Sequence, residues 1–100
     1  MDFDVWVPGN HELDYGSERF AAFIDQVRVP ILNGNIRVFE RVLPALRVFK
    51  RAGLTVAVIG MNSSFQSNWL WGERMRGMSW ESAVSAIERI MPAVFAERPD

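Results

Sequence analysis

The first third of the chain alternates between β-forming and helix-forming patterns, and this order constrains the fold more than any other feature. The run FDVWV at residues 3–7 is rich in β-formers and ends in a Pro-Gly pair, which predicts a short buried strand. Residues 17–27 carry apolar side chains at helical spacing, with Ser17 as the predicted N-cap. The run VPILNGNI at residues 29–36 predicts a second short strand, interrupted by Asn-Gly-Asn. Two strands around one helix indicate a βαβ unit, whose crossover is nearly always right-handed.

The middle of the chain allows two interpretations. Apolar residues recur at helical spacing over residues 38–49, but Pro44 lies inside this stretch and would interrupt a helix. The alternative is a β-hairpin with strands at residues 44–50 and 54–60, joined by a turn in which Gly53 supplies a permissive backbone conformation. The second of these strands, LTVAVIG, is rich in β-branched residues. We therefore predict the hairpin.

The segment from residue 62 to residue 77 has no clear period and predicts a long loop. Long loops in compact domains often carry function. Trp69 and Trp71 lie in this stretch, and aromatic side chains also commonly serve only to pin a loop onto the body of a protein. Both roles stay open for these tryptophans.

A final helix is predicted over residues 80–97, with Ser79 as its N-cap. Pro92 should bend this helix or end it early, because proline cannot donate the backbone hydrogen bond. The fold class is therefore α/β, with a βαβ unit, a β-hairpin, a long loop and a C-terminal helix, and no domain boundary within residues 1–100. The predicted apolar face of the helix consists of Trp80, Ala83, Val84, Ile87, Ile90, Met91, Val94 and Phe95.

Charge and composition exclude several classes of protein. Eleven basic and twelve acidic residues leave a formal net charge of -1, so the chain has no basic field suited to a nucleic-acid polymer. No cysteine is present to form a disulfide or a thiolate metal site. The sequence also contains neither a signal peptide nor an apolar run long enough to span a membrane. These features leave a globular domain whose compartment is unknown.

A group of polar residues after the first predicted strand is the candidate site. Asn10 offers an amide oxygen suited to divalent cations, and His11 can bind a metal ion or move a proton. Asp14 lies three positions after His11 and can accept a hydrogen bond from its imidazole, which favours the protonated ring. A plainer interpretation is also open: Asn10 could be an ordinary turn former, and Glu12 and Asp14 could be solvated carboxylates.

The motif GNHELDYG, residues 9–16, resembles the Gly-Asn-His-Glu block of the calcineurin-like metallophosphoesterases. The longer form of this block belongs to the branch of 5'-nucleotidases and 2',3'-cyclic-nucleotide phosphodiesterases, and Leu13 replaces its usual Phe. VPILNGNI, GLTVAVIGMN and GMSWESAVSAIERIMP are similar to later elements of the same family and follow in the same order. Gly34 stands where the family usually has Ala. The resemblance implies a partial metallophosphatase-type α/β sandwich.

The resemblance also implies roles for the site residues. Asn10 would be a ligand of one ion in a centre of two divalent metal ions, and both Asn10 and His11 would bind the substrate. His11 would donate to the phosphoryl or leaving-group oxygen, with Asp14 as its orienting partner. The sequence does not distinguish Mn, Zn, Fe, Mg and Ca as the metal.

The implied activity is hydrolysis of a nucleotide or other phosphoester by a hydroxide activated between two metals. The family's metal centre also needs an Asp-x-His block, a Gly-Asp block, a lone His and a Gly-His-x-His block, whereas this sequence has one His in total. We therefore expect this chain to be an internal fragment of a larger catalytic domain. Its expected partners are the flanking segments of the same domain, which are missing from this sequence. The alternatives are a truncated, non-catalytic α/β remnant with a structural or binding role and a small independent ligand-binding domain. Family resemblance suggests a periplasmic, cell-surface or secreted location.

Overall fold

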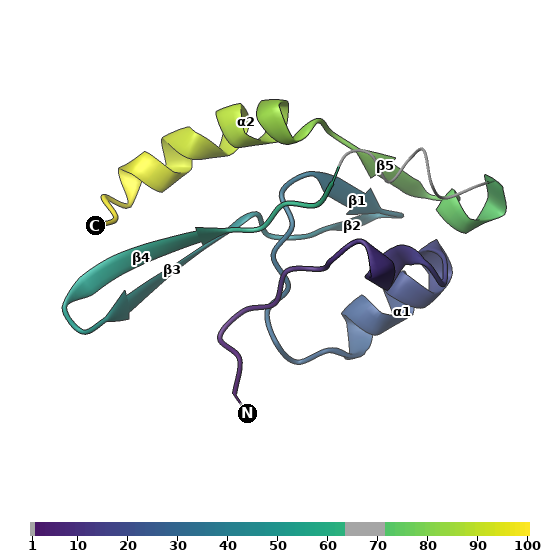
Figure 1. The fold of residues 1–100 in the computed structure, drawn as a ribbon, viewed down its shortest axis with the longest axis horizontal. Helices are drawn as coiled ribbons and strands as arrows, with labels where there is room; N and C mark the ends of the chain where they lie inside the picture. Colours follow the sequence, from purple (N-terminus) through teal and green to yellow (C-terminus); the bar gives the residue numbers. More distant parts are fainter. Residues whose placement is uncertain (1, 64–71) are drawn as a thin grey trace.

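The computed structural model describes residues 2–63 and 72–100 as a mixture of helices and short antiparallel strands (Figure 1). Strands β1, β2 and β5 form a three-stranded sheet in the order β2-β1-β5, and β3 pairs with β4 in a separate hairpin. None of the helices in these two ranges is long and apolar enough to cross a membrane. The elements are η1 (His11–Leu13), α1 (Ser17–Gln26), β1 (Ile36–Val38), β2 (Arg41–Val42), β3 (Leu46–Arg51), β4 (Leu54–Ile59), η3 (Gly72–Met75), β5 (Met78–Trp80) and α2 (Ala83–Ala96).

The expected βαβ unit is present in a reduced form. Trp6 and Ile31 form an isolated parallel bridge on either side of α1, the direction that a βαβ unit requires. The interruption predicted at Asn33, Gly34 and Asn35 is present, since β1 starts only at Ile36, but the strand predicted at residues 3–7 is reduced to this single bridge. The bridge is short because Pro8 and Pro30 have no N–H to extend it. The Trp6 N–H donates to the Pro30 carbonyl, and the Leu32 N–H donates to the Trp6 carbonyl, each at 2.9 Å.

Helix α1 covers the predicted residues, but its cap differs from the prediction. Gly16 is the N-cap, with a φ of 90° that few other residues adopt. The Ser17 hydroxyl is not used for capping; it donates instead to the Arg76 carbonyl at 2.6 Å. Ser17 therefore joins the start of α1 to the segment before β5.

Helix α1 packs on the three-stranded sheet. Phe20 and Ala21 of α1 lie against Ile36 and Val38 of β1, and Leu13 of η1 completes this buried cluster. Leu13 and Val38 are both 0% exposed. Because Leu13 is buried against the sheet, it holds in place the turn on which the candidate site lies.

The hairpin around Gly53 is confirmed, and the alternative helix through Pro44 is wrong. β3 and β4 pair from Leu46 opposite Ile59 to Arg51 opposite Leu54. Ala52 and Gly53 both have positive φ, 50° and 80°, as a two-residue hairpin turn requires.

Helix α2 covers one face of this hairpin through residues spaced four apart, namely Ala86, Ile90 and Val94. The predicted apolar face was too broad, because Val84 and Phe95 are each 68% exposed. The helix also runs past Pro92 to Ala96 instead of ending there. Pro92 and Glu88 are exposed, so water can satisfy the Glu88 carbonyl that loses its helical partner.

The start of α2 lies later than predicted. Ser82 is the N-cap, and its hydroxyl accepts from the Ser85 N–H at 3.1 Å. Ser79 is not the cap, because Ser79 and Trp80 belong to β5, which pairs with β1.

The predicted loop at residues 62–77 is only partly covered by the structure. Residues 64–71, with Trp69 and Trp71, lie outside the described ranges. Residues 72–77 form η3 and a turn at Gly77, whose φ is 75°.

Candidate active-site turn

The candidate site is the turn Asn10–Asp14, which follows the bridged residue Trp6 and precedes α1. Asn10 opens the 3-10 helix η1, but its side chain makes no capping hydrogen bond, and the residue is exposed. Because Leu13 is buried below the turn, Asn10 and His11 are held at its outer surface. The Asn10 side-chain amide is therefore not used to cap η1.

His11 and Asp14 form the side-chain pair that their spacing predicts. The imidazole Nδ1 lies 2.7 Å from the Asp14 carboxylate Oδ2, and both side chains are largely exposed. The pairing assigns the proton on Nδ1 to the bond with Asp14 and leaves Nε2 as the ring atom that can serve a substrate.

The surroundings of His11 favour its charged form. The hydrogen bond that the His11 imidazole donates to Asp14 is the largest cause that raises the pKa of His11 above 6.5, followed by the attraction of the same carboxylate. A smaller attraction from Glu12 acts in the same direction. The raised pKa keeps more of the imidazole protonated near neutral pH, which suits a proton donor.

Removing the carboxylate should bring the pKa of His11 back toward 6.5. We expect this shift in Asp14→Asn, and a smaller one in Glu12→Gln as the matched control. The contribution of the pair to stability is present below pH 6.5 and is lost as pH rises through the raised pKa of the folded state. The measurement is an NMR titration of the ring protons of the only histidine in the chain. An unchanged pKa in Asp14→Asn would contradict the pairing.

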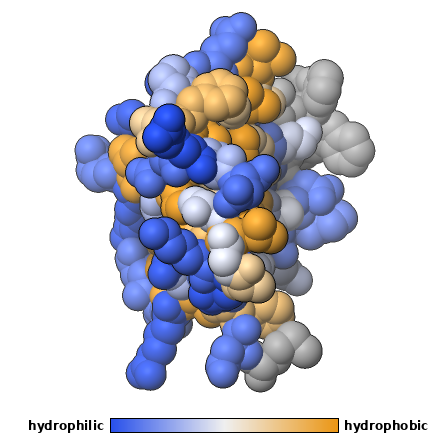
Figure 2. Space-filling model, turned by 90° about the vertical axis from the view of Figure 1, so that its left-hand side faces the viewer, coloured by the Kyte–Doolittle hydropathy of each residue, from blue (hydrophilic) through white to orange (hydrophobic). Residues whose placement is uncertain are grey.

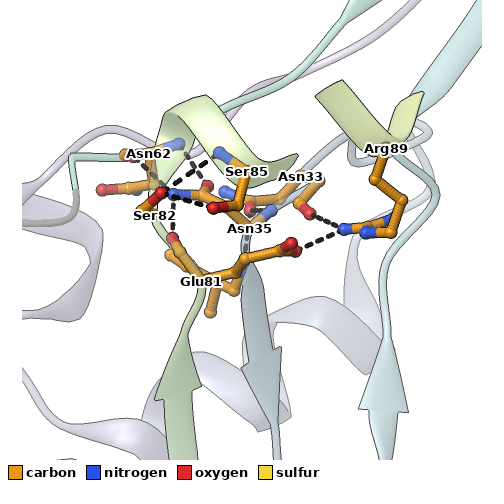
Figure 3. Close-up of polar contacts among 9 residues, drawn as sticks. Asn33, Asn35, Asn62, Glu81, Ser82, Ser85 and Arg89 are labelled. Carbon is orange, nitrogen blue, oxygen red and sulfur yellow. Dashed lines mark hydrogen bonds and ion pairs between the residues drawn. The ribbon is translucent and has the colours of Figure 1, made fainter. Parts of the chain in front are cut away.

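Behind the turn lies an asparagine cluster, defined as Asn33, Asn35 and Asn62, whose members are all buried (Figure 3). The Asn62 Nδ2 donates to the carbonyl oxygens of Pro8 and Gly9, at 3.0 and 3.1 Å. Sequence reasoning missed Asn62, because it lies 54 positions from Pro8 and an asparagine after a strand looks like an ordinary turn former.

A hollow of about 400 Å³ opens beside His11 on the α1 side of the turn. Aromatic rings line much of it, with Arg19 of α1 and Glu12 at its border. The full lining is His11, Glu12, Tyr15, Arg19, Phe20 and Phe23. His11 therefore has space next to it on the outer surface.

The donors suited to a metal ion are few within residues 2–63 and 72–100. No three His, Cys, Asp or Glu side chains come together there. The Asn10 amide oxygen fits a hard divalent cation, since it is exposed and does not cap η1. Within the described ranges, the Asn10 amide oxygen is therefore available as one ligand of a metal ion.

Comparison with known proteins shows which solved structures share this fold. A protein from Staphylococcus aureus assigned as a 5'-nucleotidase has the same fold over 99% of this chain, with a TM-score of 0.84 and 26% identity. A calcineurin-like phosphoesterase from Bacillus subtilis matches 99% of the chain with a TM-score of 0.77 and 21% identity. A Treponema pallidum protein assigned as a 5'-nucleotidase is 30% identical over 66 residues, which cover 61% of this chain. No family model matches the chain.

The chain has the fold of a part of the calcineurin-like phosphoesterases. Within this class it resembles the 5'-nucleotidases, as the GNHELDYG motif predicts. The predicted partial metallophosphatase-type α/β sandwich is thus confirmed. The chain spans 20% of the Staphylococcus aureus protein, 33% of the Bacillus subtilis protein and 11% of the Treponema pallidum protein.

Proposed function

We propose that this chain supplies the Asn-His turn of a metal-dependent phosphoesterase that hydrolyses nucleotides, of the 5'-nucleotidase or cyclic-nucleotide phosphodiesterase type. Residues 1–100 would form part of one catalytic domain that further segments complete. The observation that carries the proposal is the His11–Asp14 pair, 2.7 Å apart on an exposed turn. The likeness to a 5'-nucleotidase fold supports the same assignment.

His11 would act on the oxygen atoms of the phosphoester. Its protonated ring donates from Nε2 to a phosphoryl oxygen or to the leaving oxygen, while Asp14 holds Nδ1 and thereby the ring's orientation. The raised pKa of His11 increases the fraction of enzyme that carries this proton near neutral pH. Proton donation matters most for a leaving oxygen that would otherwise depart with a full negative charge.

Asn10 would hold one of two divalent ions and would also contact the substrate. Its amide oxygen is a neutral ligand, so it binds an ion without a competing protonation step. When bound, the ions would polarise the phosphoester and supply an activated water. Adjacent positions on one turn would then set the distance between the ion held by Asn10 and the proton donor His11.

The surface of the chain supports its being part of a larger domain. Leu54 and Val56 of β4 are 53% and 41% exposed, and Phe95 of α2 is 68% exposed. Hydrophobic surface is visible between hydrophilic residues on the end of the molecule that carries the hairpin (Figure 2). Further segments that cover such side chains would remove apolar area from water.

The function is tested by measuring phosphoester hydrolysis by the complete domain, meaning this chain with the flanking segments that the proposal requires. We expect hydrolysis of a nucleoside 5'-monophosphate or a 2',3'-cyclic nucleotide with Mn²⁺, Zn²⁺ or Mg²⁺ present, and its loss after chelation. Hydrolysis that survives complete removal of metal would contradict the mechanism. No hydrolysis with any of these ions would favour the non-catalytic remnant.

A further inference from the structure

We propose that Asn62 is a positioning residue for the Asn10–Asp14 turn, acting through the two carbonyl groups that precede Asn10. The inference rests on the proposed function for its catalytic meaning, but its structural content can be tested separately. Asn62 follows β4 and is 7% exposed, and its side chain bonds to the carbonyl groups of Pro8 and Gly9, which lead into the turn.

The contacts of Asn62 fix the orientation of its amide. The atom facing Pro8 and Gly9 lies 3.0 and 3.1 Å from two carbonyl oxygens, which can only accept. That atom must therefore be the nitrogen, and both of its hydrogens are used. A buried donor that bridges two successive carbonyls fixes the direction in which the chain leaves Gly9.

Asn62 is itself held by a second asparagine. The Asn35 Nδ2 donates to the Asn62 carbonyl, and the Asn62 N–H donates to the Asn35 Oδ1, both at 2.8 Å. These two bonds form a closed pair, which leaves the Asn62 backbone little freedom to move. Figure 3 shows Asn62 and Asn35 side by side at the start of α2.

The asparagine cluster is also bonded to the residues around the start of α2. The Glu81 N–H donates to the Asn35 carbonyl at 2.9 Å, and the Glu81 carboxylate pairs with Arg89 of α2 at 2.6 Å. Arg89 donates in addition to the Gly34 carbonyl at 2.8 Å. Asn62 thus connects the turn to a hydrogen-bonded network that joins the end of β4, the segment before β1 and the start of α2.

The matched test is Asn62→Asp, which keeps the size of the side chain and removes the two donors. A carboxylate facing two carbonyl oxygens is disfavoured, so the pKa of this carboxyl should lie above its ordinary value of about 3.9. Below that pKa the protonated acid can still donate to one carbonyl, and the turn stays in place. As the pH rises through this pKa, the carboxyl loses its proton and its hydrogen bond to the carbonyl, and the turn is no longer held in position.

The readout is the backbone amide resonances of Gly9, Asn10 and His11 in the 100-residue chain, followed against pH. We expect these three to move together in Asn62→Asp with the titration of the new carboxyl, while the amides of the β3–β4 hairpin stay in place. The native spectrum at low pH shows that the variant folds. Amides of the turn that do not respond, or that move only together with the hairpin, would overturn the inference.

Asn33→Asp is the control for burying a carboxyl in the same cluster. The Asn33 Oδ1 accepts from the N–H groups of Asn35 and Ile36, at 3.0 and 2.8 Å, and a carboxylate can accept both bonds. We therefore expect no pH-dependent movement of Gly9, Asn10 and His11 in this variant. An equal response in both variants would show a general effect of buried charge and would also overturn the inference.

Measurements of kcat on the complete domain distinguish a failure of this inference from a failure of the proposed function. If both hold, the Asn62→Asp domain should lose kcat as pH rises through the pKa of the new carboxyl, with its midpoint at the same pH as the amide shifts. A wild-type domain without activity contradicts the proposed function alone, because the amide shifts do not depend on catalysis. Full kcat in a variant whose turn has been released would overturn the positioning role.

Discussion

His11→Asn should lower the kcat of the complete domain by about 10²- to 10⁴-fold, the usual contribution of a positioned acid. Asparagine removes the titratable proton but keeps a hydrogen-bonding side chain of similar reach on the same exposed turn. Asp14→Asn should cause a smaller loss, since the imidazole stays but loses the carboxylate that orients it and raises its pKa. The measurement is kcat at saturating metal and substrate.

The choice of substrate decides which oxygen His11 serves. An aryl phosphoester has a leaving group that departs readily, so it should suffer less in His11→Asn than an alkyl phosphoester does. Equal losses of kcat on the two esters would show that His11 does not protonate the leaving group. Its remaining role would be to stabilise a phosphoryl oxygen.

Asn10→Ala should lower the rate as strongly as His11→Asn does, but through weaker binding of the metal ion. The substitution removes the amide oxygen that is exposed and not used for capping η1. An ion that loses a ligand binds more weakly, so metal occupancy and rate should fall together, and excess metal should restore part of the rate. His11→Asn is the matched control, because it changes the neighbouring residue of the same turn and should leave the metal in place.

The local pattern around the candidate site was predictable because its contacts are local. The i, i+3 spacing of His11 and Asp14 predicted a hydrogen bond between them, and the two side chains lie 2.7 Å apart. The hairpin was predictable for the same reason, since Pro44 argues against a helix and Gly53 marks the turn. In both places the decisive groups are close in sequence.

The N-terminal caps of the helices were not predictable, because contacts with residues distant in sequence decide them. Ser79 was predicted as the cap of α2, but Ser79 and Trp80 pair with β1 as part of β5, and Ser82 caps the helix instead. Ser17 was wrong as a cap for a related reason, since its hydroxyl bonds to Arg76 near β5.

The interruption predicted within the strand at residues 29–36 comes from a side chain that competes with the backbone for hydrogen bonds. The Asn33 Oδ1 accepts from two following N–H groups, at Asn35 and Ile36, and so turns the chain before β1 begins. In the same segment, a Cβ added at Gly34 would lie 2.5 Å from the Ile90 side chain of α2, so a larger residue there would require that side chain to shift.

The central claim is that Asn10 and His11 are neighbouring parts of one metal-dependent phosphoesterase site with different tasks. The most direct measurement is metal content per chain together with kcat, taken side by side for the wild-type complete domain, Asn10→Ala and His11→Asn. The account predicts that Asn10→Ala loses metal and activity together, and that His11→Asn keeps its metal while kcat falls. Full metal content and full activity in Asn10→Ala, or loss of metal in His11→Asn, would contradict it.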